Sequence, residues 1–321
     1  MQKNLKGVSV ILEHFLGSLD LSTQQYASLF SLASRILESP EQHASCCNGR
    51  LMATLFYEPS TRTRLSFEAA MSRLGGKVIS VASAQTSSVS KGESLSDTIR
   101  TVGNYADLIV LRHPKDGAAV MAAEYSPVPI INGGDGAHEH PTQTLTDLFT
   151  IYRHKGDLDN LTIAFCGDLR YGRTVHSLVE ALSRYQHVKF ILISPPELRL
   201  PERIKKEVTR MNPNTVIIET DRMEEGLEKA DVLYMTRIQK ERFFNEEDYI
   251  KLRDVYVLTA EKLNDAPEGM IVMHPLPRIT EIDPAVDADK RAVYFEQAKL
   301  GMFARMALIE SLLNKGEAQI A

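Results

Sequence analysis

The amino-acid sequence predicts an α/β protein with two domains, each a mostly parallel sheet flanked by helices. Two observations support this fold class. The chain has 321 residues, which exceeds the size at which a single hydrophobic core usually stops growing, so two domains are expected. Short apolar runs alternate with amphipathic stretches along most of the chain, and this alternation is the pattern of βαβ units and a parallel sheet.

The first half is expected to contain four strands separated by helices. After the first strand, Ser60 has the residue type of a helix N-cap, apolar residues from Phe67 to Leu74 recur on one helical face, and Gly75 ends the helix. The four strands are expected at residues 51–56, 77–81, 108–111 and 128–131.

The second half repeats the alternation and predicts a second sheet. Between the halves, Pro141 suits the first position of a helix that continues to Ile151, and we expect this helix to bridge the domains. The stretch 294–313 is also expected to be helical and to be able to pack back on the first domain. The second-half strands are expected at 161–165, 188–193, 215–218, 232–235 and 270–273, with a helix at 174–185.

Composition and charge exclude several classes of protein. The formal net charge is -5 and the isoelectric point is near 6.0, whereas a nucleic-acid-binding protein usually needs a broad basic face. The apolar run at residues 8–12 is too short for a signal peptide or a membrane span. The three cysteines include no CxxC pair. We therefore expect a cytoplasmic protein without a disulfide, a membrane contact or a bound nucleic acid.

An anion-binding motif follows the first expected strand. It reads Ser60-Thr61-Arg62-Thr63-Arg64, and it opens a helix, so unpaired backbone N–H groups, hydroxyls and the helix dipole meet at one point. Phosphate is the anion that this arrangement fits best. A plain capping box with solvated arginines remains the alternative, because hydroxyl caps are common.

Two further polar motifs also follow expected strands. Arg112 lies at the end of one strand, and His140 and Gln143 follow an expected loop, residues 133–136, after another. The carboxyl ends of parallel strands are where open α/β sheets bind ligands. His140 alone would be interpreted as a hydrogen-bonded cap, but beside Arg112 and the anion motif it becomes a candidate donor to an oxyanion.

The second half contains a segment with the spacing of a nucleotide-binding P-loop. The segment runs from Gly167 to Thr174, but Arg173 stands where the P-loop has its lysine, and Asp168 adds negative charge where phosphates would lie. A nucleotide hydrolase is therefore the weaker hypothesis. The sequence contains neither GxGxxG nor HExxH, so we expect no cofactor and no metal.

Three polar segments are ambiguous when each is considered alone. Residues 83–94 are expected to form a long polar loop, and 237–242 form a charged run after a strand; both patterns usually belong to solvated surface. In 274–278 two prolines favour an extended backbone whose carbonyls point outward, where they would accept hydrogen bonds from an –NH₂ group. A structural turn explains this segment equally well.

Together and in this order, four motifs resemble those of the transcarbamoylases. They are Ser-Thr-Arg-Thr-Arg, Arg-His-Pro, His-Pro-Thr-Gln and His-Pro-Leu-Pro-Arg, and the likeness extends over nearly the whole chain. The segments 167–177 and 234–242 resemble the aspartate-specific members. The ornithine-specific members carry a cysteine where Pro275 stands. Guanidinium groups also suit an acceptor with two carboxylates, because they bind carboxylate bidentately.

The resemblance implies a transcarbamoylase-like fold. Residues 1–141 plus 296–321 would bind carbamoyl phosphate, and residues 142–295 would bind aspartate. In this scheme the phosphate is held by Ser60, Thr61, Arg62 and Thr63, and the carbonyl oxygen is polarised by Arg112, His140 and Thr63, so that the catalytic set is Arg62, Thr63, Arg112 and His140. The carbamoyl NH₂ group is held by Gln143 and by the backbone carbonyls of Leu276 and Pro277.

The resemblance also implies an acceptor site and an assembly. The aspartate carboxylates are held by Arg173, Arg237 and Gln239. Ser87 and Lys91 match loop residues that reach carbamoyl phosphate, and for Lys91 also aspartate, in a neighbouring subunit's site. A homotrimer with shared sites is therefore expected, with regulatory chains or a dimer of trimers as further possibilities. Glu139 and Ser90 depart from the family pattern, which has Gln and often Lys there.

The implied reaction transfers the carbamoyl group of carbamoyl phosphate to the α-amine of L-aspartate, giving N-carbamoyl-L-aspartate and phosphate, an early step of pyrimidine synthesis. Positioning of two anions and donors aimed at the oxyanion are expected to supply most of the acceleration. Three other hypotheses remain: a transcarbamoylase with another acceptor, the nucleotide hydrolase, and a catalytically silent scaffold of the same fold.

Overall fold

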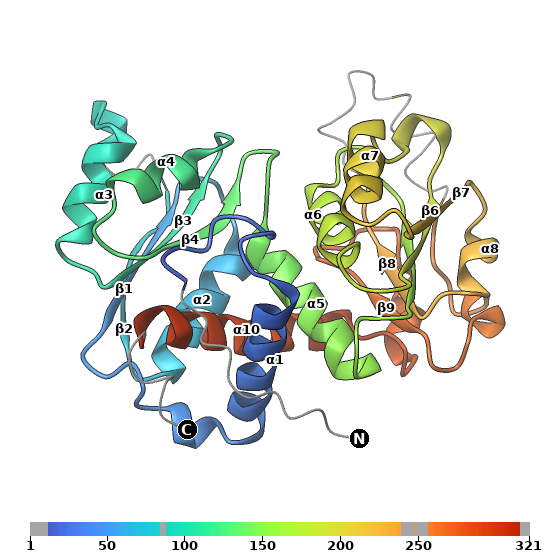
Figure 1. The fold of residues 1–321 in the computed structure, drawn as a ribbon, viewed down its shortest axis with the longest axis horizontal. Helices are drawn as coiled ribbons and strands as arrows, with labels where there is room; N and C mark the ends of the chain where they lie inside the picture. Colours follow the sequence, from blue (N-terminus) through green and yellow to red (C-terminus); the bar gives the residue numbers. More distant parts are fainter. Residues whose placement is uncertain (1–11, 84–87, 239–246, 248–255, 315–321) are drawn as a thin grey trace. The chain divides into compact units, whose positions relative to one another are not determined.

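A computed structural model of the protein describes residues 12–83, 88–238, 247 and 256–314. The chain forms two compact units, each built on one parallel sheet with flanking helices (Figure 1). Unit 1 comprises Met1–Phe149 and Lys299–Ala321, and unit 2 comprises Thr150–Ala298. The predicted fold class is confirmed. The unit limits and the expected domain limits, after residues 141 and 295, lie within the same two helices, α5 (Pro141–Lys155) and α10 (Tyr294–Leu313).

The sheet of unit 1 has four parallel strands in the order β2-β1-β3-β4. The central strands are buried on both faces, which explains why they read as continuous apolar runs rather than as alternating ones. β2 lies at an edge and is more exposed. The strands are β1 (Leu51–Phe56), β2 (Lys77–Val81), β3 (Leu108–His113) and β4 (Ile130–Asp135).

The expected loop at residues 133–136 is wrong in its first part, because β4 continues through Gly133 and Gly134 to Asp135. The register between β3 and β4 shifts between Leu111 and His113, and Gly134 has φ +118°. Glycine adopts such a conformation at little cost, so it can continue a strand past an irregular pair. Chain periodicity gives no signal for this extension, because the residues involved are not apolar.

Helices cover both faces of the first sheet (Figure 1). On one face, apolar residues of β1 and β3 pack with Ile99 of α3 (Leu95–Gly103) and Ala122 of α4 (Ala118–Tyr125). On the other face lie α1 (Thr23–Glu38), α2 (Thr61–Arg73), the first part of α5 and the main part of α10. Alternate residues of a strand point to opposite faces, so each strand contributes to both layers.

The last helix packs on unit 1, as the sequence allowed. Glu310 of α10 pairs with His43 at 2.9 Å, and the Arg305 guanidinium lies 5.2 Å from the centre of the Phe67 ring on α2. The first of these contacts reaches η1 (Pro40–His43), and the second reaches the helix that carries the anion motif.

The sheet of unit 2 has five parallel strands in the order β7-β6-β5-β8-β9. In Figure 1 the helices α6 (Arg173–Leu182) and α7 (Glu202–Met211) lie on one side of it and α8 (Met223–Leu227) on the other. The expected strands are confirmed with shifts of one or two residues at their ends. They are β5 (Thr162–Cys166), β6 (Lys189–Ile193), β7 (Val216–Thr220), β8 (Val232–Met235) and β9 (Ile271–Met273).

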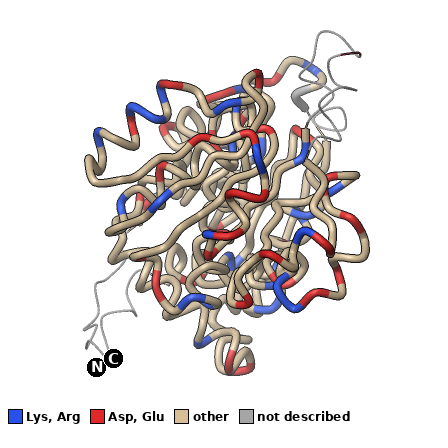
Figure 2. Tube along the Cα trace, turned by 90° about the vertical axis from the view of Figure 1, so that its right-hand side faces the viewer, with Lys and Arg blue, Asp and Glu red and all other residues tan. Residues whose placement is uncertain are grey.

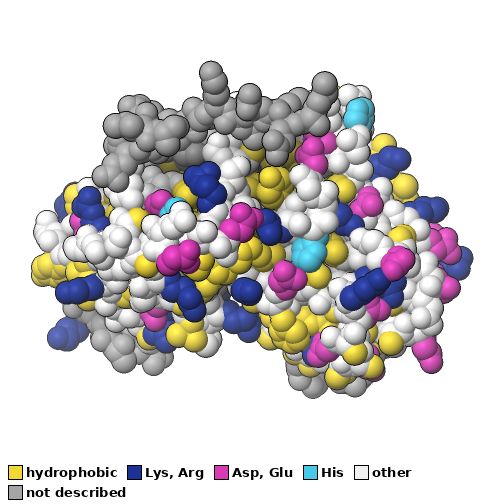
Figure 3. Space-filling view, turned by 90° about the horizontal axis from the view of Figure 1, so that it is seen from below, with side chains coloured by type: hydrophobic (Ala, Val, Ile, Leu, Met, Phe, Trp, Pro, Cys, Tyr) yellow, Lys and Arg dark blue, Asp and Glu magenta, His cyan; other side chains and the backbone are white. Residues whose placement is uncertain are grey.

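Charges of both signs are interspersed along the described chain (Figure 2), and on the face drawn in Figure 3 Lys and Arg side chains alternate with Asp and Glu. Cys46, Cys47 and Cys166 are free thiols. Within the described residues, no helix has the length and apolar character needed to cross a membrane, and no group of three or more His, Cys, Asp and Glu residues is arranged to hold a metal ion.

Candidate active site

The carboxyl edge of the first sheet collects the anion motif, Arg112 and His140. β1, β3 and β4 are neighbours; the anion motif follows β1, Arg112 lies near the end of β3, and His140 follows β4. The backbone ties the first two together, since the Tyr57 N–H donates to the Arg112 carbonyl at 2.8 Å. Parallel pairing therefore brings motifs that are far apart in sequence to one sheet edge.

The anion motif forms the N-terminus of α2, a helix of 13 residues. Ser60 occupies the N-cap position as predicted, but its side chain makes no capping hydrogen bond there. Thr61 and Arg62 are exposed, whereas Thr63 is buried. Because Ser60 makes no capping bond, its hydroxyl does not occupy the first N–H groups of the helix. Unpaired N–H groups at a helix N-terminus are the kind of donors that bind phosphate.

Arg112 is a buried arginine beside this motif, with 7% of its surface exposed. Its Nη1 donates to the Gly133 carbonyl at 3.1 Å, and its Nη2 lies 2.8 Å from Glu58 Oε2. Glu58 was not among the predicted site residues, although it lies only two residues before Ser60 of the anion motif. A buried guanidinium needs an anionic partner, and the Glu58 carboxylate supplies one.

His140 and Gln143 begin α5. The imidazole of His140 is buried, with Nδ1 3.4 Å from Thr142 Oγ1, and its backbone carbonyl accepts from the Gln143 N–H at 2.9 Å. The backbone of His140 thus accepts a hydrogen bond at the start of α5, which agrees with its interpretation as a hydrogen-bonded cap. The side chain remains a candidate donor. Gln143 is half-buried, and its Nε2 donates to Asp147 Oδ1 at 2.7 Å.

The polar segment after β2 is described only in part. Lys91 is exposed at the end of η3 (Ser88–Lys91), a single 3₁₀ turn that replaces part of the expected loop. Ser87 lies outside the described residues, as does Gln239 in unit 2.

The carboxyl edge of the second sheet collects the candidates of unit 2 that the structure describes. Arg173 opens α6 after β5, Arg237 follows β8, and the two strands are neighbours. Both arginines are half-buried. The strand ends are held together because the Thr236 N–H donates to the Cys166 carbonyl at 2.9 Å and its hydroxyl donates to the same carbonyl at 3.2 Å.

Leu276 and Pro277 follow β9, the next strand at the same edge. The extended backbone predicted for this segment is wrong: Leu276 has φ +55° and its peptide bond to Pro277 is cis. Its N–H donates to His274 Nδ1 at 2.8 Å, and His274 Nε2 lies 2.8 Å from Glu281 Oε1, both side chains being buried. This buried pair supports a sharp turn at Leu276, which is the structural turn that the sequence left open as the other explanation of this segment.

In the loop with P-loop spacing, backbone N–H groups donate to oxygen atoms of the protein itself. Asp168 is buried and accepts from the Tyr171 N–H at 2.9 Å, and the Leu169 N–H donates to the Leu198 carbonyl at 3.1 Å. A phosphate loop instead directs successive N–H groups at its ligand. The geometry therefore contradicts the nucleotide-hydrolase hypothesis.

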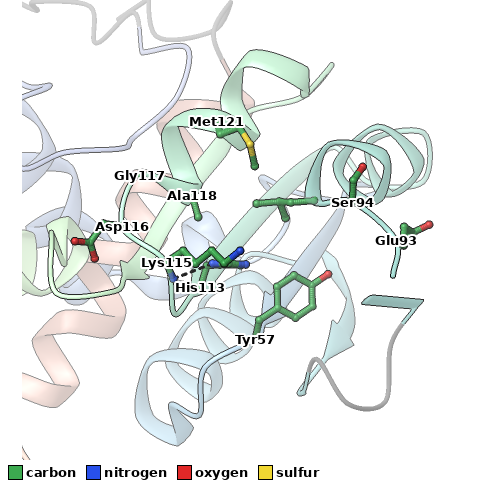
Figure 4. Close-up of a pocket in the computed structure, with 10 residues that line it drawn as sticks. Tyr57, Glu93, Ser94, His113, Lys115, Asp116, Gly117, Ala118 and Met121 are labelled. Atoms are coloured by element: carbon green, nitrogen blue, oxygen red, sulfur yellow. Dashed lines mark hydrogen bonds between the residues drawn. The ribbon is translucent and has the colours of Figure 1, made fainter. Parts of the chain in front are cut away.

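A cavity of about 410 Å³ lies in unit 1 near the ends of β1 and β3, and none of the predicted site residues lines it (Figure 4). Figure 4 shows His113 beside Lys115, whose N–H donates to the imidazole Nδ1 at 3.0 Å. Burial, followed by the charge of Lys115, lowers the pKa of His113. The Arg-His-Pro motif therefore divides, with Arg112 bonded to Glu58 and Gly133 and His113 lining this cavity.

Two family models match the chain. Residues 13–153 match the carbamoyl-P binding domain of aspartate/ornithine carbamoyltransferases, and residues 159–312 match their Asp/Orn binding domain. The catalytic subunit of aspartate carbamoyltransferase from Clostridium botulinum strain Alaska E43 is 58% identical over 302 residues, which are 94% of this chain and 98% of that relative. The chain belongs to the aspartate/ornithine carbamoyltransferase family.

Solved structures of carbamoyltransferases share the fold. The catalytic subunit of M. jannaschii aspartate transcarbamoylase has a TM-score of 0.89 at 47% identity, over 95% of this chain and 99% of that one. The Trypanosoma cruzi enzyme in complex with N-(phosphonacetyl)-L-aspartic acid has a TM-score of 0.90 at 40% identity, over 96% and 98% of the two chains. The predicted family, transcarbamoylase fold and aspartate carbamoyltransferase activity are confirmed.

Proposed function

We propose that the carboxyl edge of each sheet carries one substrate of the carbamoyl transfer to aspartate. Residues 1–141 plus 296–321 would bind carbamoyl phosphate, and residues 142–295 would bind aspartate. The observation that carries this proposal is the gathering of the anion motif, Arg112 and His140 at the ends of three neighbouring strands. Solved T. cruzi relatives contain carbamoyl phosphate, or carbamoyl phosphate with aspartate, which supports a site for each.

In this proposal carbamoyl phosphate is bound mainly by unit 1. Its phosphate accepts hydrogen bonds from the start of α2, through Ser60, Thr61, Arg62 and Thr63. Its carbonyl oxygen accepts from Arg112, His140 and Thr63, which polarise the carbonyl and stabilise the oxyanion that forms later. When the substrate binds, the Arg112 guanidinium leaves the Glu58 carboxylate and pairs with the substrate oxygen, so it has an oxygen partner before and after binding. The NH₂ group donates to Gln143 and to the carbonyls of Leu276 and Pro277.

Aspartate is bound through its two carboxylates. Arg173 and Arg237 offer planar guanidinium groups, which bind carboxylate through two parallel hydrogen bonds, and Gln239 and Lys91 add donors. The uncharged α-amine attacks the carbonyl carbon, a tetrahedral oxyanion forms, and the C–O bond to phosphate breaks. The phosphate takes up the proton lost by the amine. No covalent intermediate with the protein forms, and catalysis rests on positioning and charge stabilisation.

The proposed assembly is a homotrimer in the cytoplasm, where Ser87 and Lys91 of one chain complete the site of its neighbour. Exposure of Lys91 in the single chain supports this role, because a cation that faces solvent in one chain is free to reach a substrate bound by another. Regulatory chains and a dimer of trimers belong to the same proposal, and the product would enter pyrimidine synthesis.

The test is carbamoyl transfer by the purified chain, with L-aspartate or L-ornithine as acceptor and without added metal or nucleotide. We expect carbamoyl-aspartate alone. Arg112→Ala should lower turnover ~10²–10³-fold, since it removes one oxyanion donor. Arg100→Ala, which removes an arginine that stacks on Tyr125 of α4, is the matched control and should keep turnover. Near-normal turnover of Arg112→Ala would remove Arg112 from the mechanism, and product from ornithine would overturn the acceptor assignment.

A further inference from the structure

The amide of Gln143 is oriented by a buried carboxylate one helical turn away. Gln143 Nε2 donates to Asp147 Oδ1 at 2.7 Å, and Asp147 is fully buried on α5. An ionised carboxylate can only accept hydrogen bonds, whereas the two ends of an amide differ, one donating and one accepting. Asp147 therefore selects the amide orientation in which the NH₂ end faces the helix and the oxygen Oε1 is the end offered to a ligand.

A buried arginine of α10 interacts electrostatically with Asp147. This residue is Arg305, which is 5% exposed. Its Nη1 donates to Ser66 Oγ at 3.0 Å, and the guanidinium lies 5.2 Å from the centre of the Phe67 ring. Burial lowers the pKa of Arg305 to about 10, so it stays protonated at neutral pH. A buried carboxylate ionises readily only beside such a partner.

The approach of the two helices depends on Gly301, one turn before Arg305 on α10. A Cβ added at Gly301 would lie 2.7 Å from Thr146 Oγ1 and 2.9 Å from Arg305 Nη1, distances that atoms in a packed core do not accept. Within unit 1, α10 passes beside α5 and α2 (Figure 1). Gly301 thus provides the space that the Arg305 guanidinium occupies beside Thr146, the residue before Asp147.

We propose that Asp147, in the electrostatic field of Arg305, fixes the oxygen of Gln143 toward the substrate, so that the site selects a carbamoyl donor over an acyl donor. The inference rests on the proposed binding role of Gln143. Asp147 and Arg305 are positioning residues in it, because they act through Gln143 and do not contact substrate.

The discrimination follows from hydrogen-bond chemistry. Acetyl phosphate has the shape of carbamoyl phosphate but carries a methyl group in place of NH₂. A fixed acceptor that faces a methyl group is desolvated without a partner, and such a site rejects the analogue strongly. An amide free to turn over would instead present its own NH₂ group to the carbamoyl NH₂, two donors would meet, and the preference would be lost.

The experiment measures dissociation constants of carbamoyl phosphate, acetyl phosphate and inorganic phosphate by calorimetry on the purified assembly. Asp147→Asn should lower the preference for carbamoyl over acetyl phosphate at least about tenfold, because asparagine accepts as readily as it donates. Binding of inorganic phosphate should change less than about twofold, since the anion motif is untouched. Thr144→Val, at a buried hydroxyl on the same helix, is the isosteric control and should keep the preference.

The Arg305 variants keep the test decisive if Asp147→Asn does not fold. Arg305→Gln should lower the preference and Arg305→Lys, which retains the charge, should restore most of it. In a Gln143→Met background, Asp147→Asn should have no further effect on the preference. If Asp147→Asn or Arg305→Gln keeps the preference while carbamoyl-aspartate still forms, the inference is overturned and the proposed function stands. If Gln143→Met keeps the preference, the binding role of Gln143 is overturned. If the wild-type chain transfers no carbamoyl group, the proposed function is overturned.

Discussion

At the scale of single residues, three charged groups of the described chain that are buried or half-buried each have a polar partner. Arg112 has Glu58 at 2.8 Å, Asp147 has the amide of Gln143, and Glu139 Oε2 accepts from the Ser18 N–H at 2.7 Å. A buried charge without such a partner costs several kcal/mol. The carboxylate of Glu139, where the family usually has glutamine, is thus engaged by the N-terminal segment of the described chain.

Glu139 gives a pH-dependent prediction. Burial raises the pKa of its carboxyl. A raised folded-state pKa means that the stabilising contribution is complete below the ordinary glutamate pKa and is lost as pH rises through the folded value. Glu139→Gln keeps an acceptor for Ser18 without the charge, so the variant should gain stability over the wild type as pH rises from about 4 to 7, by up to ~1 kcal/mol.

Denaturant unfolding at a series of pH values measures this difference. Glu124→Gln removes an exposed carboxylate of α4 in the same unit and controls for the loss of one surface charge. A variant whose advantage shrinks as pH rises would show that Glu139 is stabilised as an anion, and the assigned cause would be wrong.

At the scale of elements, the ends of β5 and β8 are held together more tightly than the sequence suggests. Gly167 follows β5 with φ +118°, and a Cβ there would lie 2.3 Å from the Thr236 carbonyl oxygen, directly before Arg237. The glycine thus lets the loop that leads to Arg173 pass against the segment that leads to Arg237. Both segments carry proposed aspartate ligands.

Gly167→Ala should therefore damage unit 2 and its acceptor site together. We expect a loss of about 3 kcal/mol or more, from a backbone conformation closed to alanine and from the collision with Thr236, together with a higher KM for aspartate. Gly156→Ala is the matched control, because Gly156 also has a positive φ, +79°, but nothing lies within 4 Å of its added Cβ; it should cost only ~1 kcal/mol. Thermal unfolding and steady-state kinetics measure both, and equal costs would show that the close approach is unimportant.

The sequence predicted positions along strands better than conformations within turns. Ser60, Arg112 and His140 could be assigned to strand ends because apolar runs mark buried parallel strands, and a motif that follows one must lie at its carboxyl end. The ion pair of Glu58, the extension of β4 and the left-handed Leu276 could not be assigned. The Glu58 ion pair depends on Arg112, which is distant in sequence. The extension of β4 depends on its register with β3, and the left-handed Leu276 depends on the buried pair of His274 and Glu281.

At the scale of the whole molecule, each unit presents one set of candidates at the carboxyl edge of its sheet. Neither set contains every implied group, because the implied scheme takes Ser87 and Lys91 from a neighbouring chain. Lys91 is exposed where the structure describes it. If the site is shared, each functional site needs an intact anion motif from one chain and an intact lysine from the next. The number of functional sites in a mixed assembly then follows from how the chains are arranged in it.

The proposed shared site of the proposed trimer predicts complementation between inactive variants. Arg62→Ala and Lys91→Ala should each have low activity as pure trimers. After unfolding and refolding as an equal mixture, every mixed trimer has one site with an intact Arg62 and an intact neighbouring Lys91, so about one quarter of wild-type activity should return. Arg62→Ala mixed with Arg112→Ala is the control and should recover nothing, because both changes fall on the same side of the site. Sedimentation would verify that the refolded mixture consists of trimers. If the mixture of Arg62→Ala and Lys91→Ala recovered no activity, each chain would hold a complete site by itself.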